Sequence, residues 1–294
     1  LCARSLTIQS KQFTCDTCKQ TYRYSNGIID MIPQSAYGDT TEETWDQLYV
    51  QLQKTGDYKK HFQEYKKHHS PLLHRQLKKV QPKRKNAYLE IGSGMFFLGQ
   101  ELAKEYDVVI GVDYSRAALM LSKKMLEEKG IKNYILIRGN VLSLPIQNSV
   151  IDFIYGGGVI EHFENTQKCV NELYRVLTVG GVSFNTVPFL NIGSLTYRQV
   201  WGNIPNVPIL REIAQTVHVK ILGGKHMIFG HEYSFLASTL RNLHHRAGFE
   251  NISIEQFQVQ LAFEFIPSFM RPYAIQLAEH SPLFWPMVKV IAVK

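Results

Sequence analysis

The most constraining feature of this 294-residue chain is a short apolar segment that runs through a glycine-containing turn into a helix. Residues 87–91 read AYLEI and are followed by Gly92, Ser93 and Gly94. Glycine tolerates positive φ and lets a ligand approach the backbone closely. Apolar residues at helical spacing predict a helix over residues 98–106. This order of strand, tight turn and helix is typical of a ligand-binding turn in a parallel α/β sheet.

A second apolar stretch, residues 108–112, predicts a strand that ends at Asp113. At the carboxyl edge of a parallel sheet, this acid can accept hydrogen bonds from both hydroxyls of a ribose. Two features differ from the dinucleotide-binding fingerprint: Glu90 stands at an apolar position, and Phe97 stands where the third glycine belongs. Negative charge at Glu90 disfavours a pyrophosphate and favours a ligand with an amino group or a cationic sulfur.

The pattern Glu90-x-Gly92-x-Gly94 with Asp113 resembles the cofactor site of class I S-adenosylmethionine-dependent methyltransferases of the type 11-like group. The resemblance extends over residues 84–190, although the family usually has a glycine where Phe96 stands. It implies an α/β fold with a doubly wound, Rossmann-like sheet of seven strands, the last one antiparallel, and helices on both faces. It also implies S-adenosyl-L-methionine as cofactor and S-adenosyl-L-homocysteine as product. The implied cofactor residues are Glu90, Gly92, Ser93, Gly94, Asp113, Tyr114, Asn140, Val141 and Gly156.

The remaining predicted cofactor residues lie at the ends of the third and fourth predicted strands. Residues 134–138 form the third strand, and Asn140 follows where the family usually has an acid. The side-chain oxygen of Asn140 can still accept a hydrogen bond from the adenine amine, and Val141 would pack on the ring. The fourth strand ends at residues 156–158, three glycines that leave room where cofactor and substrate meet.

Two histidines are candidate general bases for an oxygen acceptor. His162 lies in the segment 159–163, which resembles the hydrophobic-Glu-His sequence of the family. An imidazole titrates near neutrality and can remove a hydroxyl proton; the alternative is a helix-entry histidine that bonds to the backbone. His231 precedes Glu232 and a helix predicted over residues 235–247, so it is a second candidate base or an ordinary helix cap.

Three cysteines near the beginning of the chain indicate a metal site. Cys15 and Cys18 have the two-residue gap of zinc ligands, and Cys2 is a third candidate. Residues 22–33 resemble the end of the short zinc-ribbon module found ahead of many methyltransferases. We therefore predict a zinc-ribbon-like segment over residues 1–36, with zinc as a further cofactor. The alternative is a set of free thiols in a reducing cytoplasm.

The rest of the chain divides into a helical linker or lid and a catalytic domain. Apolar residues at helical spacing between residues 40 and 80 predict helices over the cofactor mouth, in a linker that spans residues 37–82. Residues 83–294 then form the methyltransferase domain. It has acceptor-side insertions at about residues 189–234 and 260–286.

Charge and hydropathy limit the partners. The formal net charge is +8, and lysines, arginines and histidines gather in residues 59–85. This segment is either an anion-binding face, for RNA, a phospholipid surface or a phosphorylated substrate, or a solvated helix face. The chain shows neither a membrane-spanning apolar run nor a signal peptide at its start, so we expect a cytoplasmic protein with peripheral membrane contact as an alternative.

The acceptor is predicted only as a class. The Asn/Asp-Pro-Pro-aromatic sequence of amino methyltransferases of nucleic acids is absent. We therefore expect O-methylation of a small-molecule, sugar-like or lipid-linked hydroxyl. The alternatives are methylation of rRNA or tRNA, supported by the basic segment, and a catalytically silent scaffold that binds the cofactor and recruits a partner.

Overall fold

The computed structural model describes residues 6–9, 12–15, 19, 21–32, 40–80, 82–191, 204–221, 232–257 and 267–294. The chain divides into two compact units. The first comprises Leu1–Tyr155 with Arg175–Val182, and the second comprises Gly156–Tyr174 with Ser183–Lys294.

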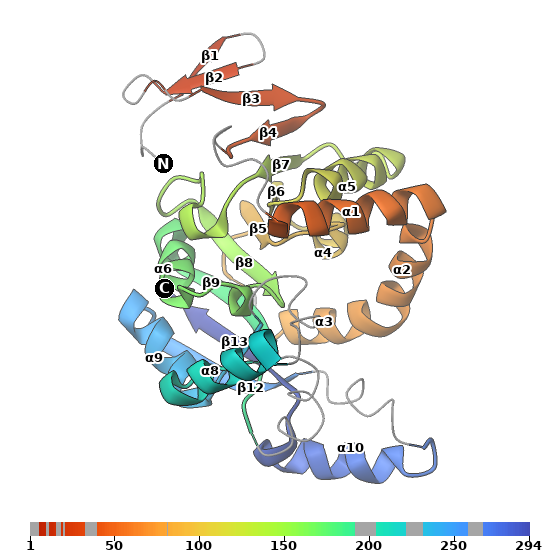
Figure 1. The fold of residues 1–294 in the computed structure, drawn as a ribbon. Coiled ribbons are helices and arrows are strands. Elements are labelled where there is room, and N and C mark those ends of the chain that lie inside the picture. Colours follow the sequence, from red (N-terminus) through yellow and green to blue (C-terminus); the bar gives the residue numbers. More distant parts are fainter. Residues whose placement is uncertain are drawn as a thin grey trace. The chain divides into compact units, whose positions relative to one another are not determined.

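The first unit is built on neighbouring parallel strands in the order β7 (Tyr134–Arg138), β6 (Val108–Asp113), β5 (Ala87–Ile91) and β8 (Ile151–Gly157), and β8 belongs to it up to Tyr155 (Figure 1). All of β5 is buried. Strands that follow β5 in the chain lie on both of its sides, β6 on one and β8 on the other. Ligands of open α/β sheets bind outside the carboxyl ends of the strands at such a switch point.

Two helices follow the first strands of this sheet. α5 (Arg116–Glu128) begins where Ser115 Oγ accepts a hydrogen bond from the Ala118 N–H, and it buries an apolar face as the sequence predicts. α4 (Phe97–Leu102) is shorter than the predicted helix over residues 98–106. The Asn133 side-chain amide donates to the Ala103 and Tyr106 carbonyls at 2.8 and 2.9 Å, which satisfies carbonyls beyond the end of the helix.

The N-terminal part extends this sheet. Strands β1 (Leu6–Gln9), β2 (Gln12–Cys15), β3 (Thr21–Ser25) and β4 (Ile28–Asp30) pair antiparallel in chain order. β4 then pairs parallel with β7, with Ile28 opposite Leu136 and Asp30 opposite Arg138. The predicted zinc ligands Cys2 and Cys18 lie outside the described residues, as does the side chain of Cys15.

Residues 40–55 and 58–77 are helical, as the apolar spacing predicts. α1 (Thr40–Thr55) is followed by α2 (Tyr58–Glu64), a π-helical turn η2 (Tyr65–His69) and α3 (Ser70–Leu77) (Figure 1). Ser70 and Pro71 begin α3, but helical backbone continues through η2 without a break. A small apolar cluster anchors these helices, since Tyr58 of α2 packs with Leu121 and Met125 of α5.

The second unit contains the remaining strands and the helices around them. Its sheet order is β9 (Leu177–Pro188, in this unit from Ser183), β13 (Met287–Val293) and β12 (Asn251–Phe257). β12 and β13 are antiparallel, as predicted for the last strand. β10 (Ile204–Pro205) and β11 (Tyr233–Ser234) form a short parallel pair. The helical elements are η4 (Ile160–His162), α6 (Thr166–Val176, in this unit up to Tyr174), α8 (Pro208–Gln215), η6 (Thr216–Ile221), α9 (Ala237–Ala247), α10 (Arg271–His280) and η9 (Pro282–Phe284).

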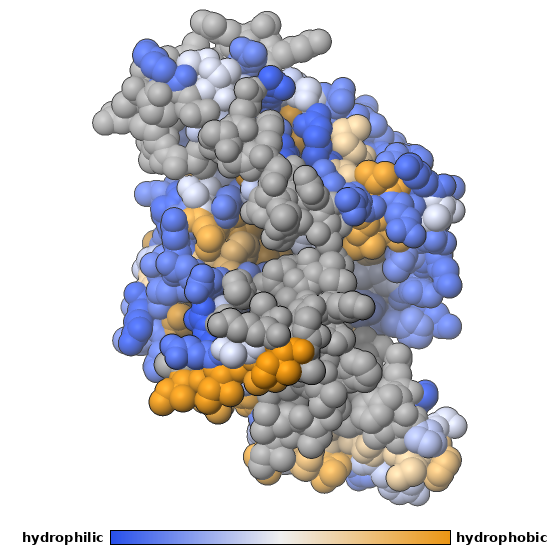
Figure 2. Space-filling model, viewed as in Figure 1, coloured by the Kyte–Doolittle hydropathy of each residue, from blue (hydrophilic) through white to orange (hydrophobic). Residues whose placement is uncertain are grey.

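One surface of the second unit is strongly apolar. Ile209, Ile213 and Ile221 on α8 and η6 expose 75%, 56% and 71% of their surface. They recur at helical spacing, and the patch over α8 is visible in Figure 2. Among the helices that the structure describes, none combines the length and the apolar character needed to cross a bilayer.

Candidate cofactor site

The turn after β5 depends on its glycines. Gly92 and Gly94 adopt φ values of +52° and +51°, which L side chains rarely do. The Ser93 N–H donates to the Val112 carbonyl at 3.1 Å and ties the turn to β6. A Cβ on Gly94 would come within 2.6 Å of the Tyr49 hydroxyl oxygen, so α1 lies directly against this turn.

Phe96 adopts a backbone conformation that favours glycine, the residue expected at this position from the family resemblance. Its φ and ψ are 54° and 40°, in the left-handed region, and its side chain is fully buried at the start of α4. The ring needs space from two other glycines: a Cβ would approach it to 2.1 Å on Gly99 and to 3.3 Å on Gly111. This packing was not predicted from the sequence, where its signal is a glycine inside a helix and another inside a strand.

Asp113 joins the turn to the start of α5. Its Oδ2 accepts the Gly94 N–H at 2.7 Å and its Oδ1 accepts the Ser115 N–H at 2.8 Å. Burial raises the pKa of this carboxyl to about 6, although both backbone hydrogen bonds act in the opposite direction. No described Lys or Arg forms an ion pair with it. Each carboxylate oxygen has a further lone pair, so Asp113 can also accept from ligand hydroxyls.

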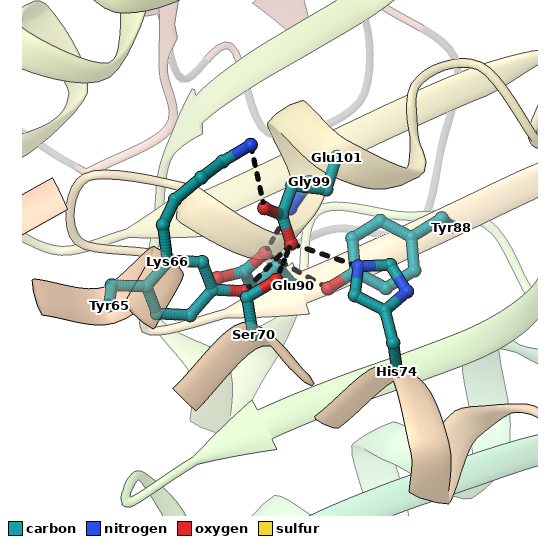
Figure 3. Close-up of polar contacts among 8 residues, drawn as sticks. All are labelled: Tyr65, Lys66, Ser70, His74, Tyr88, Glu90, Gly99 and Glu101. Carbon is teal, nitrogen blue, oxygen red and sulfur yellow. Dashed lines mark hydrogen bonds and ion pairs between the residues drawn. The ribbon is translucent and has the colours of Figure 1, made fainter. Parts of the chain in front are cut away.

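Glu90 is buried below the same turn (Figure 3). Its Oε2 accepts the Tyr88 hydroxyl and the Gly99 N–H, both at 2.9 Å. Burial raises the pKa of Glu90 to about 8, so the carboxyl is largely protonated at pH 7 in the absence of a ligand. A bound group with positive charge would favour its ionised form.

A second carboxylate, Glu101 of α4, holds the helices that precede the sheet. Its Oε2 accepts hydrogen bonds from Tyr65 at 3.3 Å and Ser70 at 2.8 Å, and it contacts His74 Nε2 at 2.9 Å. Lys66 Nζ lies 3.4 Å from its Oε1, and all four partners come from η2 and α3 (Figure 3). Two members of the basic segment therefore point inward at Glu101. The sequence analysis missed this cluster.

The ends of β6 and β7 meet beside Asp113. The Gly139 N–H donates to the Asp113 carbonyl at 3.0 Å, and Arg138 Nε donates to the Tyr114 carbonyl at 3.2 Å. Asn140 is exposed, and its Oδ1 accepts the Leu142 N–H at 2.8 Å as the cap of the short helix η3 (Val141–Ser143). Val141 is buried. The first unit thus brings together every predicted cofactor residue except Gly156.

The second unit contains Gly156 and the predicted bases. Gly156 is buried in β8. His162 is half-buried at the end of η4, and its N–H donates to the Val159 carbonyl at 3.1 Å. His231 lies outside the described residues. Glu232 does not open a helix, because β11 follows it and α9 begins at Ala237 instead of the predicted residue 235.

The residues of the first unit fit the predicted cofactor. Glu90 is a buried acid and Asp113 a half-buried one, and they lie at the carboxyl ends of adjacent strands, next to a turn that lets a ligand approach its backbone. A ligand with ribose hydroxyls would satisfy the acceptors of Asp113, and a cationic ammonium or sulfonium would compensate the acids. S-adenosylmethionine carries all of these groups.

Comparison with known proteins agrees with this geometry. Residues 89–184 match the family model described as a methyltransferase domain. A curated relative, the demethylmenaquinone methyltransferase of Anoxybacillus flavithermus, is 30% identical over 73 residues. That match covers 25% of this chain and only 31% of the relative.

Two solved structures show the fold. The YcgJ protein of Bacillus subtilis is similar with a TM-score of 0.50 at 18% identity, covering 77% of this chain and 99% of that protein. A S-adenosylmethionine-dependent methyltransferase of Thermotoga maritima gives a TM-score of 0.52 at 14% identity, covering 86% and 99%. Residues 89–184 therefore match the methyltransferase-domain family model, in a chain that shares the Rossmann-like α/β fold of these two solved structures.

Proposed function

We propose that the chain is a S-adenosylmethionine-dependent methyltransferase. The observation that carries the proposal is the pair of acids on either side of the Gly92–Gly94 turn, Glu90 buried and Asp113 half-buried, neither of which forms an ion pair with a Lys or Arg among the described residues. Methyl transfer from a sulfonium is an in-line displacement, so the protein must align the reactants and exclude water. The contact of Tyr49 with the turn supports exclusion of water by α1.

The acceptor that we propose is a small-molecule, sugar-like or lipid-linked hydroxyl. His162 supports an oxygen acceptor, because a half-buried imidazole can take the hydroxyl proton during transfer. The exposed apolar face of α8 supports a lipid-linked molecule. Relatives whose names specify demethylmenaquinone, a lipid-soluble quinone, support an apolar acceptor but not the choice of a hydroxyl.

Calorimetric titration with S-adenosylmethionine and S-adenosylhomocysteine tests the cofactor. We expect Asp113→Asn to weaken binding by about 1–3 kcal/mol, because a charged acceptor for the ribose hydroxyls is lost. Asp107→Asn is the matched control, since Asp107 is an exposed acid at the start of β6. Unchanged affinity in the Asp113 variant, or no binding by the wild type, would contradict the proposal.

Isotopically labelled methyl donor, incubated with cell extract and followed by mass spectrometry, would identify the acceptor. The two variants to compare are His162→Asn and His231→Asn. We expect the variant that removes the base to lose turnover while its affinity for the cofactor changes little. If both variants turn over at the rate of the wild type, neither histidine acts as a base. Cofactor binding without turnover on any extract would favour the silent scaffold.

RNA methylation is the second candidate, because many cations of residues 59–85 remain exposed. Lys66 and His74 contact Glu101 and Lys85 pairs with Glu105 at 2.6 Å, but the following side chains face solvent: Lys59, Lys60, Lys67, Arg75, Lys78, Lys79, Lys83 and Arg84. Affinity for RNA that falls linearly with the logarithm of salt concentration would favour this candidate. Turnover on small acceptors without RNA binding would exclude it.

Zinc in the N-terminal segment stays a prediction from Cys2, Cys15 and Cys18. Among the residues that the structure describes, no cluster of metal ligands is found. The antiparallel β1–β2 hairpin that ends at Cys15 supports a ribbon-like segment. Metal analysis of the purified protein, compared with a Cys18→Ser variant, tests the prediction.

A further inference from the structure

The N-terminal segment reaches the edge of the sheet where the cofactor residues lie. β4 and β7 are parallel with Asp30 opposite Arg138, and β6 and β7 are parallel with Asp113 opposite Arg138. The three strands therefore end together. Asp30 stands two strands away from the predicted ribose carboxylate, at the same carboxyl edge.

Arg138 bridges the two sides of this edge through its guanidinium. Nη1 donates to Asp30 Oδ2 at 3.0 Å, and Nε donates to the Tyr114 carbonyl at 3.2 Å. The side chains of Asp30 and Arg138 each expose only 5% of their surface. The backbone adds a contact, since the Met31 N–H donates to the Arg138 carbonyl at 2.8 Å. Tyr114 directly follows Asp113, so one side chain links the N-terminal segment to the cofactor loop.

Arg116 makes a second link from the same loop. Its Nη2 donates to Ser25 Oγ of β3 at 2.8 Å, and its Nη1 lies 3.7 Å from Asp30 Oδ2. Arg116 begins α5, directly after Ser115, whose N–H holds the Asp113 carboxylate. The loop of residues 113–116 is thus fixed at two points by the segment of residues 21–32.

The buried charge of Asp30 makes this arrangement sensitive to one side chain. A buried carboxylate that two arginines share is stable only while its partners are present, and removing one member leaves an uncompensated charge. Without the charge of Asp30, Arg138 loses its ion pair and the Tyr114 carbonyl loses a fixed donor. The loop that carries Asp113 then keeps its other hydrogen bonds but loses the fixed contact from Arg138.

We propose that Asp30 is a positioning residue for the cofactor site, acting through Arg138 on the loop that carries Asp113. The N-terminal segment is therefore part of the cofactor-binding machinery as well as an extension of the sheet. This inference rests on the proposed function, because the bound molecule is S-adenosylmethionine.

The test uses the full chain and measures the affinity for S-adenosylhomocysteine together with the melting temperature. We expect Asp30→Asn to raise the dissociation constant about fivefold or more, and Asp30→Glu to recover part of the loss. Ile28→Val is the control for stability, since Ile28 is fully buried in the same strand and makes no contact with the ion pair in the described hydrogen bonds. It should lower the melting temperature and leave the affinity unchanged.

A double variant shows whether Asp30 acts through Arg138. Arg138→Lys keeps the charge but cannot reach both partners with a planar fork. If Asp30 acts through Arg138, then Asp30→Asn should add nothing to the affinity loss of Arg138→Lys. Equal affinity of wild type and Asp30→Asn would overturn this inference alone, as would an equal affinity loss in Ile28→Val. Absence of binding by the wild type would instead overturn the proposed function and the inference with it.

Discussion

At the scale of single residues, Phe96 shows how one position can change without changing the backbone around it. The left-handed conformation costs an L residue about 1–2 kcal/mol relative to glycine, and the burial of a phenylalanine ring offsets it by a comparable amount. The ring is accommodated because Gly99 and Gly111 carry no Cβ. Three positions therefore form one packing unit.

We predict that Gly99→Ala destabilises the protein by about 1–3 kcal/mol, because the new Cβ would lie 2.1 Å from the Phe96 ring. Alanine is a better helix former than glycine, so the loss comes from the clash. Denaturant unfolding measures it. In the background of Phe96→Ala the same substitution should be neutral or stabilising, and an unchanged loss there would contradict this packing unit.

The two cofactor acids predict a pH dependence. Their folded pKa values, about 8 for Glu90 and about 6 for Asp113, are raised above the ordinary values of unfolded carboxyls. The native state therefore holds more protons, and stability is lost as pH rises through this window, by an amount on the order of a few kcal/mol. Between pH 5.5 and 8.5 the melting temperature of the ligand-free protein should fall less in Glu90→Gln than in the wild type. If the melting temperatures of the wild type and of Glu90→Gln change with pH in parallel, the raised pKa of Glu90 is contradicted.

At the scale of elements, η2 and α3 are held by polar contacts on Glu101, α2 by a small apolar cluster around Tyr58, and α1 by hydrogen bonds from the start of α5 to Asp46. The helices themselves were predictable from the spacing of their apolar residues. Their attachment was not, because Glu101 shares no sequence pattern with Tyr65, Ser70 and His74. Contacts between distant polar residues leave no periodic signal in a single sequence.

We predict that Glu101→Gln loosens residues 58–77 without unfolding the protein. The neutral amide loses the ion pair with Lys66 and the charged acceptor for the hydrogen bonds with Ser70 and His74, at a cost of about 1–3 kcal/mol. Hydrogen exchange in α2 and α3 should then accelerate, with little change in global stability. Glu105→Gln is the control, because the Lys85–Glu105 pair is about one-third exposed on both sides and contributes little. Equal exchange in both variants would show that Glu101 does not hold these helices.

At the scale of the whole molecule, the sequence was most informative where structure is local. The strand–turn–helix around Gly92 and Gly94, the strand that ends at Asp113 and the antiparallel last strand all follow from short patterns, and the structure has each of them. The sequence was least informative where segments that are distant along the chain pack together. The parallel pairing of β4 with β7 and the Asp30–Arg138 ion pair were not predicted, because either strand could have remained an edge.

The apolar face of α8 yields a prediction for the protein as a whole. If the acceptor is lipid-linked, the protein should sediment with phospholipid vesicles, and Ile209→Asp with Ile213→Asp should reduce the bound fraction. These side chains expose 75% and 56% of their surface. Val179→Asp is the matched control, since Val179 is 84% exposed but lies in β9, outside α8 and η6. The lipid surface would be contradicted if the Ile209→Asp/Ile213→Asp variant and the Val179→Asp variant lost vesicle binding equally. It would also be contradicted if the wild type did not bind vesicles.

The pairing of β4 with β7 also has a consequence for the order in which the polypeptide can assemble during translation. Asp30 and Arg138 are separated by 108 positions. At ribosomal speeds this corresponds to roughly 5–20 s between the emergence of the two strands. Throughout that interval the nascent hairpins end in an open strand with unpaired amides, a template for association with other chains. The edge of β4 can therefore find its native partner only after β7 has emerged.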